Sequence, residues 1–430
     1  MALRIVIVTL GSQGDVQPFA ALGIGLKAAG HAVKLATGKD FESFVQASGL
    51  NFVPVRGDIR AMLSTAEGQR LIRSRNPLIT IHRMKQVAGQ LLGTMQEDIL
   101  KAVEGADAVV FSYLCGPVID VAEKTGLPCF LGILQPLIRT GEFPHFTMTS
   151  RDLGPALNRL TYDLFQLIMW AFFGNMANRW RRERFGLPPV RPIRRIERLG
   201  IPVLGAFSPE VIPKPADWPD NSCVTGYWFL DTGVNWQSPI ELQDFLIAGQ
   251  RPVCISFGSM VHNKPEQIKE IVCGSLKRAR QRAILIGGWG GLGEAKENSD
   301  MIFCADSVPY DWLFPRVAAV IHHGGAGTTA AALRAGVPSV VVPFFADQPF
   351  WAHRVHMMGV SPQPIPRRSL TSARLTHAIR VAVQDEGLRQ RAADIGHRIR
   401  NEDGVAAAIE AIQRHLETRS RKGGALSVTM

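Results

Sequence analysis

The sequence alternates short apolar runs with amphipathic stretches, and this pattern constrains the fold more than any other feature. Helical patterns lie between the runs, for example at residues 18–29, where Gly30 follows as a helix terminator. Buried strands that alternate with helices are typical of parallel sheets covered by helices, so the first half is predicted to be α/β. Its apolar runs occupy residues 4–9, 32–36, 108–112, 129–133 and 202–206.

The alternation pauses between residues 212 and 239, a stretch with four prolines, and then restarts. The later apolar runs occupy residues 252–257, 282–286, 301–305, 318–322 and 339–342. We expect two Rossmann-like domains, residues 1–235 and 236–400, that face each other across a cleft. Residues 401–430 are expected to form a helix that returns to the first domain and frays from residue 419 onward. Open α/β sheets bind ligands at the carboxyl ends of their strands, so the cleft is the expected site.

The six cysteines lie far apart and match neither a disulfide framework nor a zinc site. This spacing favours a reduced, cytoplasmic compartment. The apolar run near the N-terminus is too short for a signal peptide, and residues 164–173 are too few to span a bilayer. No pattern of metal-ligating residues is present, so no metal is expected.

The formal net charge is +11, and arginines concentrate between residues 179 and 198, where only Glu183 and Glu197 oppose them. Two interpretations stay open: a solvated helix face and loop, or contact with an anionic membrane surface. Nucleic acid is not expected as a partner, because no recognised nucleic-acid-binding motif accompanies the charge.

The most specific motif is the glycine-rich turn within residues 318–336, which follows an apolar run and opens a helical pattern. Gly325 and Gly327 permit the close approach of a ligand, and Thr328 supplies a hydroxyl beyond His323. Main-chain amides and the positive end of a helix favour a phosphate group at such a turn. The alternative is that the glycines only shorten the turn, which leaves the paired histidines unexplained.

Two further turns follow strands in the same half. Ser259 lies in a Phe-Gly-Ser-Met turn of a common type, so its signal alone is weak. Asp347 and Gln348 combine a carboxylate with an amide, which suits hydrogen bonds to sugar hydroxyls, although this pair also occurs as a helix cap.

Asp15 stands in the turn after the first apolar run, within the segment GSQGDVQP of residues 11–18. One interpretation makes it the N-cap of a helix that begins near Pro18. The other makes it a general base that faces the cleft. The two roles are compatible.

In combination, the segments HHGGAGTT, ADQ, GSQGDVQP, ISFGSM and VPYDWLF resemble family 1 glycosyltransferases of the two-Rossmann-domain (GT-B) fold. Residues 135–145, 178–182 and 224–231 are similar to segments of the sterol 3-beta-glucosyltransferase group within that family. The resemblance implies a set of donor-binding residues with three tasks. The diphosphate is held by His323, Gly325, Gly327 and Thr328. The nucleotide base is contacted by Val308, and Ser259 also lies in the donor site. The sugar is contacted by Asp347 and Gln348.

The implied reaction is an inverting transfer of a hexosyl group, glucose from UDP-glucose, to a hydroxyl of a lipophilic acceptor such as a sterol. Asp15 is the implied base, and no cofactor is expected besides the nucleotide sugar as co-substrate. Plant members of the wider family carry a ribose-binding glutamate where this chain has Ala331. The choice between a uridine and a thymidine nucleotide as donor therefore stays open. The alternatives are a nucleotide-sugar epimerase of the same fold and a non-catalytic membrane-surface protein.

Apolar residues between 157 and 176 cover more of a helix surface than one buried stripe requires. Either the helix is buried against the first sheet, or part of this face lines a cleft for a lipid. In the second case the arginines that follow rest on the anionic headgroups of the membrane that supplies the lipid.

Overall fold

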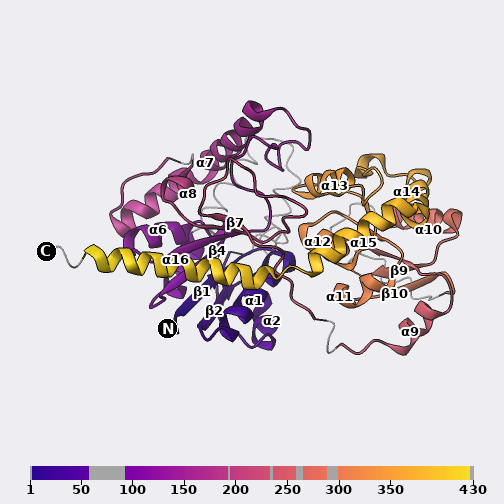
Figure 1. Ribbon diagram of the computed structural model, residues 1–430, viewed down its shortest axis with the longest axis horizontal. Coiled ribbons are helices and arrows are strands. Elements are labelled where there is room, and N and C mark those ends of the chain that lie inside the picture. Colours follow the sequence, from indigo (N-terminus) through magenta and orange to yellow (C-terminus); the bar gives the residue numbers. More distant parts are fainter. Residues whose placement is uncertain are drawn as a thin grey trace.

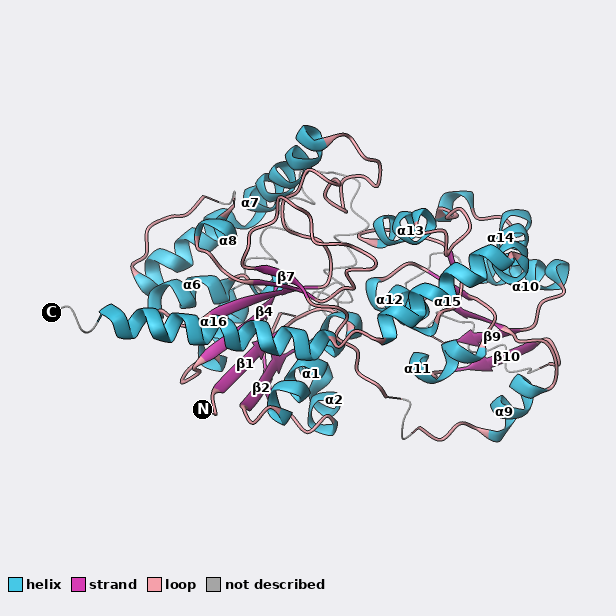
Figure 2. Ribbon diagram, in the orientation of Figure 1, coloured by secondary structure: helices cyan, strands magenta, loops and turns pink. Residues whose placement is uncertain are grey.

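The computed structural model describes residues 2–57, 93–191, 194–232, 236–257, 265–287 and 299–426. Figure 2 shows the strands of this part of the chain gathered in two separate sheets, each with helices packed around it. The protein is therefore built from two α/β halves, as the two rounds of alternation predict.

The first sheet has seven parallel strands in the order β3-β2-β1-β4-β5-β6-β7. The order reverses between β1 and β4, the point at which doubly wound sheets leave a crevice for ligands. Its strands are β1 Arg4–Val8, β2 Ala32–Thr37, β3 Asn51–Pro54, β4 Ala108–Ser112, β5 Cys129–Ile133, β6 Val203–Gly205 and β7 Ser222–Val224.

The second sheet has five parallel strands in the order β10-β9-β8-β11-β12, and here the order reverses between β8 and β11. The carboxyl ends of β8 and β11 are thus the second place where a ligand crevice is expected. The strands are β8 Val253–Ser256, β9 Ala283–Ile286, β10 Ile302–Ala305, β11 Val320–His322 and β12 Ser339–Val341.

Helices connect the strands and cover both sheets, and residues 93–102 are helical as well. In the first half they are α1 Gln13–Ala28, α2 Glu42–Ala47, α6 Pro117–Thr125, α7 Pro155–Phe185 and α8 Arg195–Arg198. In the second half they are α9 Ile240–Ile247, α10 Pro265–Ala279, α11 Tyr310–Leu313, α12 Ala326–Ala335, α13 Gln348–Met357, α14 Ser372–Gln384 and α15 Glu386–Arg400; α16 Gly404–Leu426 follows.

Every apolar run named above forms a strand, but two strands were not expected. β3 and β7 are short, and β7 lies inside the proline-rich stretch between residues 212 and 239. Three residues between turns are too few to show an alternating pattern. The stretch therefore does not simply join the halves, since part of it completes the first sheet.

The last helix returns to the first half, where Figure 1 shows α16 running alongside α1. Ala408 and Ile412 of α16 join the core that Phe19 and Leu22 of α1 form against the first sheet. Arg419 donates a hydrogen bond of 2.6 Å to the Gly126 carbonyl. α16 extends to Leu426 and so includes part of the segment that is expected to fray.

Candidate functional site

A cavity of about 2190 Å³ lies between the two halves and is lined by both of them. The segments after β1, β4 and β5 line it from the first half, and those after β10, β11 and β12 line it from the second. All of these segments leave the carboxyl ends of parallel strands, so the cavity lies where the two topologies place it.

Asp15 lines this cavity from the first turn of α1. Its carboxylate accepts hydrogen bonds from the Ser12 main-chain N–H at 2.7 Å and from the Ser12 hydroxyl at 2.8 Å. Ser12 is the N-cap, so Asp15 stands at the N3 position of a capping box. The prediction that Asp15 caps a helix starting near Pro18 is thus wrong in position: α1 begins at Gln13 and includes Pro18.

Gly11 makes room for the Asp15 carboxylate. Its φ is +133°, and a Cβ atom there would lie 2.5 Å from Asp15 Oδ2. Only glycine satisfies both conditions, since other residues rarely adopt this backbone and their side chains would displace the carboxylate. The Gly-Ser pair before Asp15 therefore positions it for the cavity.

Asp347 faces the cavity from the second half, at the N-cap position of α13. Its Oδ2 accepts hydrogen bonds from Trp351 Nε1 at 3.0 Å and from Gln135 Nε2 at 3.3 Å. Gln135 follows β5, so this hydrogen bond joins the two halves of the molecule. The preceding residue, Ala346, has a φ of +57°, a conformation that non-glycine residues hold only where the surroundings impose it.

The two carboxylates, Asp15 and Asp347, act on each other electrostatically. Burial raises the pKa of Asp347, the hydrogen bonds from Trp351 and Gln135 act in the opposite direction, and the charge of Asp15 adds to the rise. The structure thus brings together two of the predicted site residues that are far apart in the sequence.

The glycine-rich turn follows β11 and opens α12, as the sequence predicts. His322 is fully buried, and its Nδ1 accepts a hydrogen bond from the Gly324 N–H at 3.1 Å. Burial lowers the pKa of His322 to about 3 and that of His323 to about 4. Both imidazoles are therefore neutral near neutral pH, and only His323 lines the cavity.

Gly325 is the N-cap of α12 and lies against His323. A Cβ atom at Gly325 would come within 2.5 Å of His323 Nε2, whereas at Gly327 it would meet no atom within 4 Å. Gly327 therefore borders open space in the cavity at the positive end of a helix, where an anionic group is favoured.

Thr328 is nearly buried in the first turn of α12 and also lines the cavity. It lies in hydrogen-bond contact with Tyr310, whose hydroxyl is 2.7 Å from Ser256 Oγ. The three hydroxyl groups thus connect the ends of β8, α11 and α12.

Two of the three remaining predicted donor residues, Val308 and Gln348, are buried. Val308 lines the cavity, but its side chain is buried in the core of the second half. Gln348 lines the cavity as well, and its Oε1 accepts hydrogen bonds from the N–H groups of Phe344 at 2.8 Å and Phe345 at 3.2 Å. Ser259 lies outside the described residues.

The inner face of α7 lines the first-half part of the cavity with large apolar side chains. Its opposite side carries the outer stripe, five aliphatic side chains that are 41–56% exposed. The sequence offered two alternatives, a helix buried against the first sheet or a face that lines a lipid cleft, and neither describes the inner face and the outer stripe together. Periodicity shows how wide an apolar surface is, but not what it contacts. The inner face comprises Tyr162, Phe165, Met169, Trp170 and Phe173, and the outer stripe comprises Leu157, Leu160, Leu164, Leu167 and Ile168.

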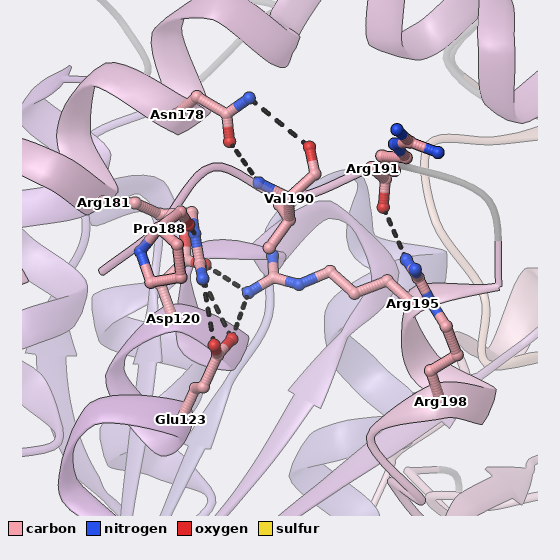
Figure 3. A network of polar contacts seen from close by, with 9 residues as sticks. All are labelled: Asp120, Glu123, Asn178, Arg181, Pro188, Val190, Arg191, Arg195 and Arg198. Atoms are coloured by element: carbon pink, nitrogen blue, oxygen red, sulfur yellow. Dashed lines mark hydrogen bonds and ion pairs between the residues drawn. The ribbon is translucent and has the colours of Figure 1, made fainter.

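Buried ion pairs fix α7 to its neighbours, as Figure 3 shows. Arg181 of α7 is fully buried, with Nη1 at 2.5 Å from Asp120 Oδ1 and 3.0 Å from Glu123 Oε2 on α6. Arg195 of α8 pairs with the same two carboxylates. Hydrogen bonds from Arg181 hold the pKa of Glu123 below its usual value. These two arginines are therefore neither a solvated face nor membrane contacts.

Sequence reasoning missed several residues that shape the cavity. Arg334, one turn after Ala331, forms a two-bond ion pair with Asp231 that joins the halves, with Nη2 at 3.0 Å from Oδ2. Gln135 and Trp351 hold Asp347. The only sequence signal for Gln135 was its place at the start of the segment 135–145, similar to sterol 3-beta-glucosyltransferases.

Within the described ranges, no group of three or more His, Cys, Asp and Glu side chains is arranged to hold a metal ion. No helix in the same ranges has the length and apolar character needed to cross a bilayer.

Two domain families match the chain. The glycosyltransferase family 28 N-terminal domain matches residues 5–144. The C-terminal domain of the erythromycin biosynthesis protein CIII-like family matches residues 294–409. Each match contains one of the two turns described above, with Asp15 in the first and His323 in the second.

Curated relatives match along almost the whole chain. Two sterol 3-beta-glucosyltransferases of Arabidopsis thaliana are 39% and 37% identical over 96% of this chain, which spans 66% and 68% of their lengths. A sterol 3-beta-glucosyltransferase of Emericella nidulans is 38% identical over 99% of this chain, which spans 31% of that protein. The chain is thus shorter than these relatives.

Solved structures share the fold at low sequence identity. The glycotransferase of kitacinnamycin aligns with a TM-score of 0.73 and 19% identity, over 96% of this chain and 98% of that one. The glycosyltransferase VinC in complex with dTDP aligns with a TM-score of 0.68 and 20% identity, over 97% and 100%. Two facing Rossmann-like halves of this kind constitute the GT-B fold.

Proposed function

The chain belongs to the sterol 3-beta-glucosyltransferase family, and from this membership we propose that it transfers a hexosyl group from a nucleotide diphosphate sugar to a hydroxyl of a lipophilic alcohol. Glucose and a sterol are the proposed sugar and acceptor, after the names of the relatives. One observation carries the proposal: a single cavity is lined both by the glycine-rich turn and by the apolar inner face of α7.

Asp15 is the proposed catalytic base. An alcohol is a weak nucleophile at neutral pH, so a carboxylate must take its proton while the oxygen attacks the anomeric carbon. Asp15 faces the cavity and is held by Ser12, and Asp347 lies near enough to act on it electrostatically. A single displacement by the acceptor inverts the anomeric centre, in contrast to the double displacement through a covalent intermediate that retains it.

The donor site is proposed at the start of α12. Negative charge builds up on the departing nucleotide diphosphate, and the amides at a helix N-terminus stabilise such charge without rearrangement. His323 and Thr328 border the same part of the cavity, and Asp347 is placed to accept hydrogen bonds from sugar hydroxyls.

An epimerase of this fold would bind the same nucleotide sugar but would need no apolar acceptor surface. The aromatic and aliphatic residues of the inner face therefore favour transfer. Incubation with UDP-glucose, dTDP-glucose and a sterol, followed by mass spectrometry of the lipid fraction, tests the proposal and identifies the nucleotide. Release of nucleotide without any glycosylated lipid would contradict it, and the proton coupling constant at the anomeric carbon tests inversion.

We also propose that the outer stripe contacts the surface of an anionic membrane from which the acceptor is drawn. The stripe continues toward the exposed Arg179 and Arg182 in the last part of α7, which supplies the charge that anionic headgroups attract. Sedimentation with anionic vesicles should fall in Leu160→Gln with Leu164→Gln and should weaken with salt. Ile240→Gln removes a still more exposed apolar residue from α9 and should change nothing. Equal sedimentation of all three proteins would remove this contact.

A further inference from the structure

Two buried polar side chains in the acceptor part of the cavity wall have atoms without a hydrogen-bond partner among the described residues. They are His145, at Nε2, and Tyr162, at its hydroxyl. Both side chains are 1% exposed and both line the cavity. Their rings meet edge to face, with centroids 5.1 Å apart. Native proteins rarely leave buried polar atoms unpaired, so a ligand that completes them is expected.

The hydrogen bonds of His145 fix which ring nitrogen carries its proton. The Thr147 main-chain N–H donates to His145 Nδ1 at 3.3 Å, and the Thr147 hydroxyl, 2.9 Å from the same nitrogen, can donate to it as well, so Nδ1 is assigned as the acceptor. Burial lowers the pKa of His145 to about 4, and the imidazole is therefore neutral near neutral pH. A neutral imidazole has one proton, which must then be on Nε2. The unpartnered Nε2 is consequently a donor.

Tyr162 offers the complementary group. Burial raises the pKa of its hydroxyl and the charge of Asp217 adds to the rise, so the phenol stays neutral and can both donate and accept. His145 is also stacked on Phe165 and Phe146, with centroids 4.0 Å and 4.6 Å away. His145 and Tyr162 thus place uncharged polar groups within an aromatic part of the cavity wall.

We propose that His145 and Tyr162 form a subsite for an uncharged oxygen of the acceptor, a hydroxyl or a carbonyl, other than the hydroxyl that is glycosylated. Such an oxygen accepts the His145 Nε2–H and exchanges a second hydrogen bond with Tyr162. The glycosylated hydroxyl must reach Asp15 in the first turn of α1, whereas His145 and Tyr162 belong to the aromatic wall that α7 forms. The inference rests on the proposed function and narrows it to apolar alcohols that carry a second oxygen.

Titration calorimetry with a matched pair of acceptors tests the subsite without requiring turnover. The pair is a sterol whose only oxygen is the 3-hydroxyl and the same ring system with one additional hydroxyl, each presented in cyclodextrin. One neutral hydrogen bond corresponds to a preference of about tenfold for the second compound in the natural protein. Tyr162→Phe keeps the ring but removes one of the two proposed hydrogen bonds, so this preference should fall severalfold. Tyr310→Phe removes a hydroxyl from the donor part of the cavity and should leave the preference unchanged.

The outcomes separate the two proposals. Equal affinities for both compounds in the natural protein overturn the subsite and leave the transferase proposal standing. If neither compound binds while the nucleotide sugar still binds, the result contradicts the sterol acceptor and the subsite together. If Tyr162→Phe does not fold, as judged by loss of nucleotide binding, His145→Phe replaces it, because phenylalanine fits between Phe146 and Phe165 without an N–H group.

Discussion

The two parts of the cavity wall are built by different means. The part proposed to bind the donor consists mainly of main chain, namely a glycine-rich turn and the N-terminus of α12, beside the neutral imidazole of His323. The acceptor part consists of side chains on α7 and on the loop after β5, held by buried ion pairs. The spacing of glycines within one segment specifies the donor part, whereas contacts between residues far apart in the sequence assemble the acceptor part.

Asp15→Asn has the largest expected effect on activity. It tests the proposed catalytic base, which must act on the donor and the acceptor at the same time. The amide can still accept the hydrogen bonds of Ser12 but cannot take a proton, so transfer should fall by about a hundredfold to ten-thousandfold. Donor affinity, measured by calorimetry, should change little. Ser12→Ala is the matched control, since it removes one hydrogen bond to Asp15 and keeps the carboxylate. Turnover at the natural rate in Asp15→Asn would place the base elsewhere.

Arg181→Ala should damage the acceptor part through stability. It leaves Asp120, which is almost fully buried, with fewer charge partners, and breaking a buried pair typically costs about 3–5 kcal/mol. Chemical denaturation measures the loss. Arg182→Ala, at the exposed neighbouring position, should lie within about 0.5 kcal/mol of the natural protein. Similar stability for both variants would show that the network does not hold α7.

His323→Ala addresses the donor part alone. A hydrogen bond to a charged phosphate is worth about 1.5–3 kcal/mol, so nucleotide affinity should fall by roughly tenfold to a hundredfold. The sterol affinity should not change, because His323 lies in the second half. Calorimetry that gives an unchanged nucleotide affinity would remove His323 from the donor site.

The pH dependence of stability sharpens the comparison, because a buried neutral histidine lies in each part. The folded-state pKa of His145 is lowered to about 4, while the unfolded chain takes up the proton near 6.5. This stabilisation is complete above about pH 6.5 and is lost as pH falls toward 4.

Comparison with His145→Asn isolates that contribution, since the raised pKa values of Asp347 and Glu197 act alike in both proteins. Between about pH 7 and about pH 5.5 the natural protein should lose roughly 1 kcal/mol relative to the variant. A constant difference in unfolding free energy across this range would mean that the pKa of His145 is not lowered by folding.

Gly327→Ala has the smallest expected effect on the fold. Its Cβ meets no atom within 4 Å, and alanine in a helix should stabilise the protein by about 0.5–1 kcal/mol. Donor affinity should nevertheless decrease, because the methyl group occupies the space that a diphosphate needs. Higher stability with unchanged donor affinity would show that the donor does not approach this turn.

The sequence allowed most of the donor part to be predicted, since β11, its turn and α12 follow one another directly. Asp15 was identified too, but the start of its helix was wrong, because Pro18 suggested a first turn that α1 has already passed. The acceptor part needed tertiary contacts. No local pattern shows that Arg181 meets Asp120, or that His145 is stacked on Phe165.

The return of α16 has a consequence for how the protein is made. All strands of the first sheet have been synthesised when Val224 is complete, but Ala408 and Ile412, which cover Phe19 and Leu22, are synthesised only after the whole second half. The nascent first half therefore carries an uncovered apolar face on α1 throughout synthesis of the second. The chain can therefore close this core only after α16 has been synthesised.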